Sequence, residues 1–91
     1  MTINRYAKRR DANEKVIFDA LSSIPFLRVM RQDWIDLVVQ NTSTGATYLL
    51  EVKTEHGRLT KKQEALIDDG WRIHVVTTIK EALDAVGVWQ A

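Results

Sequence analysis

The sequence has no cysteine, and its 91 residues include only one proline and four glycines. Without cysteine, disulfide bonds, thiolate metal sites and cysteine nucleophiles are excluded, although this says little about the cellular compartment. The chain also lacks an apolar run long enough to span a bilayer, and its polar, basic N-terminus has no signal-peptide pattern. We therefore expect a cytoplasmic protein with no membrane partner.

The chain has little net charge, only +1, but its charges are unevenly distributed. Residues 1–10 contain basic side chains and no acid, and a second basic group follows residue 57. The two groups are Arg5, Lys8, Arg9 and Arg10, and then Arg58, Lys61 and Lys62. Charge separated in this way can form a locally positive face that attracts nucleic-acid phosphates. A basic N-terminus that is simply solvated is the alternative for the first group.

The composition is that of one globular domain, with 45% hydrophobic and 27% charged residues. No repeat, low-complexity tract or internal linker divides the chain. We expect a single domain over residues 1–91, in which residues 1–6 form a flexible basic arm.

Hydrophobic periodicity predicts an α/β fold in the order α-β-β-β-α-β-α, with a mixed sheet flanked by helices. The first helix is expected from Ala7 to about Ser23, and Pro25 ends it. The second is expected within residues 57–70, with Thr60 as its N-cap and Gly70 at its end. The expected strands are 26–31, 36–40, 46–53 and 71–78, and the last helix is 79–87.

The stretch NTSTG, residues 41–45, consists of turn-forming residues between two β-rich runs and predicts a hairpin. If the turn is centred on residues 43 and 44, paired residues have numbers that add up to 87. Asp36 then lies opposite Glu51, with Cβ atoms about 4.5–5.5 Å apart, and Lys53 shares the face of Glu51. The opposite face is expected to pack the core with Leu37, Val39, Leu50 and Val52.

Two directly opposed carboxylates repel each other and destabilise a sheet. A divalent cation removes this conflict, because Mg²⁺ prefers a few carboxylates together with waters and phosphate oxygens. The adjacent Lys53 ammonium can hold a water and stabilise charge that develops on a phosphate. Asp36, Glu51 and Lys53 therefore indicate a metal-dependent phosphodiesterase site, and a solvated strand end is the alternative.

Glu14 is a third acidic candidate, because it lies one helical turn before Ile17 and two before Leu21. It therefore shares their core-facing stripe, where a carboxylate needs a partner. A metal is one such partner. A glutamate that interacts favourably with the helix dipole is the alternative.

These residues resemble the pattern of the PD-(D/E)xK nuclease superfamily, and within it the chain is most similar to the VRR-NUC family, the virus-type replication-repair nucleases. The pattern consists of Asp36, the run Glu51-Val52-Lys53 and Gln63 within GRLTKKQEAL. The likeness covers nearly the whole chain, from the helix that carries Glu14 to the closing segment VVTTIKEAL.

The resemblance implies a role for each matching residue. Asp36 and Glu51 would ligate Mg²⁺ or Mn²⁺, with the backbone carbonyl of Val52 and the carboxylate of Glu14. Lys53 would position the attacking water, and Gln63 would line the site. The resemblance also implies a homodimeric endonuclease that acts on branched DNA such as Holliday junctions, encoded by a phage and acting in a bacterial host cell.

The chain departs from the family pattern where a proline usually precedes the motif aspartate, because Ile35 stands there. Trp34, next to it, is expected to anchor the core, and an aromatic platform for a base or sugar is the alternative. Val88 and Trp89 either form a dimer surface or fold back on the core. A nucleic-acid-binding module without catalysis is the alternative function, and a structural domain is a third.

Overall fold

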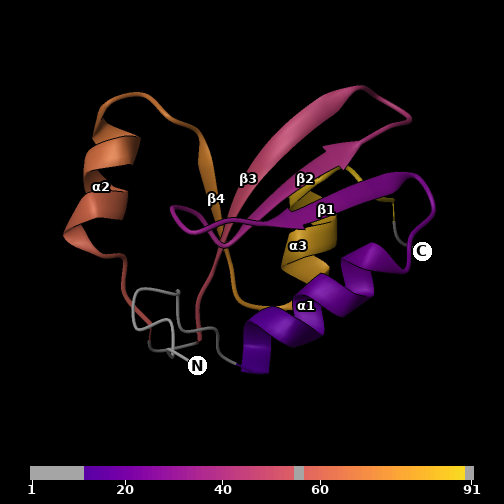
Figure 1. Cartoon of the computed structure of the whole chain (residues 1–91), viewed down its shortest axis with the longest axis horizontal. Coiled ribbons are helices and arrows are strands. Elements are labelled where there is room, and N and C mark those ends of the chain that lie inside the picture. Colours follow the sequence, from indigo (N-terminus) through magenta and orange to yellow (C-terminus); the bar gives the residue numbers. More distant parts are fainter. Residues whose placement is uncertain (1–11, 55–56, 90–91) are drawn as a thin grey trace, which may run out of the picture.

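The computed structural model describes residues 12–54 and 57–89, which form a mixed β-sheet and three helices (Figure 1). The elements in chain order are α1 (Ala12–Ser22), β1 (Leu27–Arg31), β2 (Leu37–Asn41), β3 (Ala46–Val52), α2 (Lys61–Asp68), β4 (Ile73–Val76) and α3 (Ile79–Ala85). This α-β-β-β-α-β-α order is the predicted one. The expected basic arm, residues 1–6, and the expected start of the first helix, residues 7–11, lie outside the described residues.

The strands are arranged in their chain order, β1-β2-β3-β4. The first three are antiparallel, whereas β4 runs parallel to β3 and is reached through α2, as a parallel connection requires. Leu37 pairs with Leu50 and Val38 with Leu49, so the predicted register is confirmed. This register brings Asp36 and Glu51 to the same end of the hairpin.

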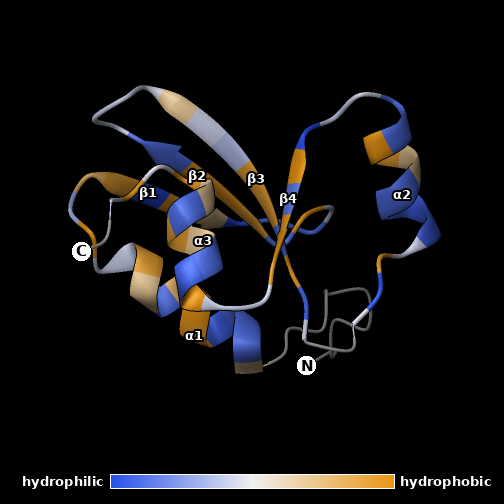
Figure 2. Cartoon of the chain, turned by 180° about the vertical axis from the view of Figure 1, so that it is seen from behind, coloured by the Kyte–Doolittle hydropathy of each residue, from blue (hydrophilic) through white to orange (hydrophobic). Residues whose placement is uncertain are grey.

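The core lies on one face of the sheet, where α1 and α3 pack side by side (Figure 2). The four residues predicted to face the core, Leu37, Val39, Leu50 and Val52, are all buried. Ile17 and Leu21 of α1 and Ala82 of α3 complete the contact between the layers. The alternation along β2 and β3 therefore fixes which side chains are left to project from the opposite face.

Helix α2 lies apart from this core, beyond the β4 edge of the sheet (Figure 1). Gln63 is its buried residue, whereas Leu66 is half-buried and Ile67 is exposed. The apolar residues of this helix therefore do not pack into the core. Hydrogen bonds at its ends define α2 instead, because Thr60 caps its start and Gly70, with a φ of 104°, closes its end.

Among the described residues, the ends of the strands and of the last helix differ from the predicted ones by at most two residues, and the difference at the last strand has a local cause. The last strand was expected over residues 71–78 but spans Ile73–Val76. The N–H of Trp71 instead donates to Leu66 O in the turn that closes α2, and the Thr78 side chain caps α3. Both ends of the expected strand are thus used by the neighbouring helices.

In the described part of the chain, no helix has the length and hydropathy needed to cross a membrane. Near the C-terminus, the half-buried Val88 packs against the core, whereas Trp89 is 85% exposed. Of the two expected arrangements of this segment, folding back on the core therefore holds for Val88 and not for Trp89.

Candidate active site

Asp36 and Glu51 are buried at the end of the β2–β3 hairpin, with 5% and 1% of their surface exposed. The N–H of Val52 donates to Asp36 Oδ2 over 2.8 Å, and the N–H of Asp36 donates to Glu51 Oε1 over 3.3 Å. Each carboxylate is thus held by the backbone of the opposite strand. These N–H dipoles reduce the repulsion that direct opposition causes.

Lys53 follows β3 and places its Nζ 3.2 Å from Glu51 Oε2, with 18% of the side chain exposed. Its backbone is fixed on both sides, because its N–H donates to Val76 O and its carbonyl accepts from Asn13 Nδ2. The predicted contact between Glu51 and Lys53 is therefore present. These hydrogen bonds fix the Lys53 backbone at a position from which its side chain reaches the carboxylate.

Gln63 reaches Glu51 from α2 and at the same time belongs to the cap of that helix. Its backbone N–H donates to Thr60 Oγ1, and its Oε1 accepts from the Thr60 N–H over 2.9 Å. Because the amide oxygen is used by the cap, the amide nitrogen faces Glu51, and Nε2 donates to Glu51 Oε2. The capping box therefore sets the orientation of a site residue.

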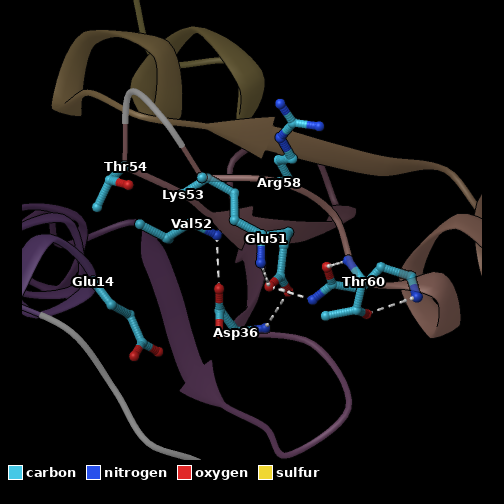
Figure 3. Close-up of a pocket in the computed structure, with 10 residues that line it drawn as sticks. Glu14, Asp36, Glu51, Val52, Lys53, Thr54, Arg58 and Thr60 are labelled. Atoms are coloured by element: carbon cyan, nitrogen blue, oxygen red, sulfur yellow. Dashed lines mark hydrogen bonds and ion pairs between the residues drawn. The ribbon is translucent and has the colours of Figure 1, made fainter.

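These side chains share one cavity of about 320 Å³ (Figure 3). Glu14, buried in the first turn of α1, lines it from the side opposite α2. The lining residues are Glu14, Asp36, Glu51, Val52, Lys53, Thr54, Gly57, Arg58, Thr60 and Gln63. All six residues predicted for catalysis or metal binding therefore lie together, although they come from α1, the hairpin and α2.

The residues expected to bind DNA are distributed differently. Arg58 lines the cavity, and Lys61 and Lys62 are exposed in the first turn of α2. The other four, Arg5, Lys8, Arg9 and Arg10, lie outside the described residues. The described lining of the cavity thus combines three carboxylates with the cationic side chains of Lys53 and Arg58.

Sequence reasoning missed two residues that support the site. Asn13 Nδ2 donates to Lys53 O and to Thr77 O, so it joins the start of α1 to the ends of β3 and β4. Gly57 passes so close to Lys53 that an added Cβ would lie 3.2 Å from the Lys53 Cβ. No motif indicates the role of Asn13, because it depends on a contact across 64 residues.

The side chains fit a hard divalent cation by their chemistry, since the candidate ligands are carboxylate and carbonyl oxygens. Among residues 12–54 and 57–89, no three His, Cys, Asp or Glu side chains are gathered closely enough to form a metal site by themselves. Mg²⁺ needs no such cage, because it is commonly bound through one or two carboxylates, with waters and substrate phosphate as the other ligands. Asp36 and Glu51 meet that requirement.

Comparison of the whole chain with models of known protein families, with curated proteins and with solved structures gives no significant match. The function must therefore be inferred from the geometry and chemistry of the cavity.

Proposed function

We propose that this protein is a Mg²⁺- or Mn²⁺-dependent deoxyribonuclease, a structure-specific endonuclease that hydrolyses phosphodiester bonds in branched DNA. The observation that carries the proposal is the meeting of Asp36, Glu51 and Lys53 in one cavity, in the register that the sequence predicts. Carboxylates that can hold a cation, next to an amine that can hold a water, are what phosphodiester hydrolysis requires. The resemblance to VRR-NUC nucleases points to the same chemistry.

In this mechanism Asp36 and Glu51 would hold the metal, with Glu14 and the Val52 carbonyl as further ligands. A cation held there would supply neutralising charge for the phosphate and would lower the pKa of a bound water. Lys53 donates hydrogen bonds that hold the attacking water or a phosphate oxygen, and Glu51 keeps its amine in place. Gln63 fixes the Glu51 carboxylate, and Arg58 contacts the DNA backbone.

We propose further that two copies act together as a homodimer. A domain of this size with one site cuts one strand, whereas a two-fold dimer presents two sites to a branched substrate such as a Holliday junction. The exposed Trp89 supplies apolar surface of the kind that such contacts bury.

The second candidate is a nucleic-acid-binding module without catalysis. It is favoured by the hydrogen bonds from Val52, Asp36 and Gln63, which hold both carboxylates in the fold without requiring a cation. The basic residues would serve this function equally well. Two buried carboxylates at the binding cavity would, however, repel DNA phosphates unless a cation lay between them.

The variant Glu51→Gln separates these functions, because it removes a charge and keeps the size of the side chain. Cleavage and binding are measured on labelled four-way junction, flap, single-stranded and duplex DNA, with Mg²⁺, Mn²⁺ or EDTA. Glu64→Gln is the matched control, since Glu64 is exposed on α2 and does not line the cavity.

If the protein is a nuclease, the wild type and Glu64→Gln should cut DNA when a metal is present. Glu51→Gln should not cut, and should bind DNA as tightly as the wild type or more tightly. If the wild type binds DNA and cuts none of the substrates with either metal, the binding module is correct instead. If neither the wild type nor Glu51→Gln binds DNA, a structural domain is the remaining function.

A further inference from the structure

Trp34 and Trp71 form an exposed aromatic pair outside the hydrophobic core. Their ring centroids are 6.0 Å apart with an interplanar angle of 65°, so the edge of one ring meets the face of the other. Trp34 is 37% exposed and Trp71 50% exposed, and neither belongs to the core cluster. The expectation that Trp34 anchors the core is therefore wrong, and two large ring systems are left facing solvent.

Trp34 brings one end of the pair close to the candidate active site. Trp34 is two residues from Asp36, so their Cα atoms are at most about 7 Å apart. The loop that carries Trp34 connects β1 and β2, and its contact with Trp71 brings it against the segment between α2 and β4. Trp71 lies just past the C-terminal end of α2, whose first turn carries Gln63, the side chain that donates to Glu51.

The position of Trp71 is set by the backbone before any partner binds. Its N–H donates to Leu66 O, and the N–H of Gly70 donates to Ile67 O, which together form a Schellman closure of α2. The Gly70 φ of 104° allows this turn. An aromatic ring on such a fixed turn can accept a flat partner without a large loss of conformational entropy.

The charges around the pair favour a base over a phosphate. Arg72 and Asp69 line, with Trp71, a surface hollow of about 370 Å³, and Asp33 directly precedes Trp34. The two carboxylates outnumber the one guanidinium, so the local charge does not favour a phosphate at the rings, whereas an uncharged base can stack there. Lys53 and Arg58, which line the cavity, remain available for the phosphates.

We propose that Trp34 and Trp71 form a stacking platform for an unpaired base next to the scissile phosphate, so that the protein acts on DNA whose strand is unpaired beside the cut. The inference rests on the proposed nucleic-acid substrate and adds which part of it is recognised. Inside a duplex both faces of each base are already stacked, so a platform of this kind discriminates against the paired interior of DNA.

The test uses tryptophan fluorescence, because the sequence has only three tryptophans. In the variant Trp89→Phe, which changes a residue 85% exposed, the signal comes from Trp34 and Trp71 alone. This protein is titrated in EDTA, which prevents metal-dependent cutting, with a single-stranded oligonucleotide and with a blunt duplex of the same sequence. We expect quenching by the single strand and much weaker quenching by the duplex.

The variant Trp71→Ala, made in the same background, should weaken single-strand binding by about five-fold to more than a hundred-fold, the range that base–aromatic stacking supplies. Trp71→Phe should restore part of this loss. The slope of log affinity against log salt should stay the same in all three proteins, because no phosphate contact is removed. A melting curve for each variant shows whether it is folded.

Equal quenching by single strand and duplex, or equal single-strand affinity in folded Trp71→Ala, would overturn the platform. These outcomes are independent of cleavage. If quenching is specific for the single strand and no DNA is cut in Mg²⁺ or Mn²⁺, the platform stands and the proposed nuclease activity fails.

Discussion

At the scale of single residues, the central feature is the number of groups that hold Glu51. Its carboxylate accepts from the Asp36 N–H, from Gln63 Nε2 and from Lys53 Nζ, which belong to three different segments. A side chain 1% exposed needs such partners, because burial of an unpaired charge is costly. The same partners fix the direction of both oxygens, as a metal ligand requires.

Asp36→Asn should separate stability from activity. The new amide oxygen can accept from the Val52 N–H in place of Oδ2, so the free energy of unfolding in EDTA should change by about 1 kcal/mol or less. Metal-dependent cleavage should fall by about a hundredfold or more, because the cation loses a charged ligand. Denaturant unfolding and initial cleavage rates measure the two effects, and a wild-type rate in folded Asp36→Asn would contradict the assigned role.

Asn13→Ala should weaken the site from a position outside the cavity. Loss of the hydrogen bonds to Lys53 O and Thr77 O should lower the free energy of unfolding by about 1–2 kcal/mol and reduce cleavage more than binding. Lys15→Ala is the control in the same helix, since it removes only an exposed ion pair with Asp19. Equal cleavage by the two variants would show that Asn13 has no positioning role.

At the scale of elements, α2 is a short helix that contributes one buried side chain, Gln63, to the site. The capping box between Thr60 and Gln63 begins the helix and also orients the amide that holds Glu51. Stability of α2 and geometry of the site are therefore coupled through the same two residues. The closing turn at Gly70 connects the other end of the helix to the aromatic pair in the same way.

Thr60→Val tests this coupling, because valine keeps the shape of threonine and cannot accept from the Gln63 N–H. We expect a loss of about 1 kcal/mol in the free energy of unfolding, with a fall in cleavage as the Gln63 amide loses its fixed orientation. Thr60→Ser keeps the hydroxyl and should stay near the wild type in both measurements. Full activity of Thr60→Val would mean that the cap and the site are independent.

At the scale of the whole molecule, the cavity is assembled from α1, the hairpin and α2, so a bound cation should stabilise the entire fold. A metal at ten times its Kd adds about 1.4 kcal/mol, which raises the Tm of a domain of this size by roughly 6–11 °C. We expect such a rise for the wild type in Mn²⁺, and a much smaller one for Asp36→Asn. Thermal unfolding with and without EDTA makes the comparison, and identical shifts in both proteins would place the metal elsewhere.

The sequence predicted the β2–β3 register, because the turn NTSTG fixes its centre and the alternation of apolar residues permits only one face to be buried. This was enough to bring Asp36, Glu51 and Lys53 together. The position of Glu14 followed from its helical spacing to Ile17 and Leu21.

Other features depend on contacts between distant segments and could not be predicted. Leu59, Leu66 and Ile67 have the spacing of an apolar helix side, but periodicity does not say whether another layer is present to cover that side. Likewise, Trp34 was expected in the core because of its size, and its contact with Trp71 across the chain gave no local signal.

The most direct measurement for the central claim is metal-dependent cleavage of one labelled branched DNA by the wild type, Lys53→Ala and Lys80→Ala. Lys53 lies against Glu51 in the cavity, whereas Lys80 forms an exposed ion pair with Asp84 on α3. The account predicts cutting by the wild type and Lys80→Ala in Mg²⁺ or Mn²⁺, none in EDTA, and a loss of about a hundredfold or more for Lys53→Ala. Equal rates for the two lysine variants, or rates that persist in EDTA, would contradict it.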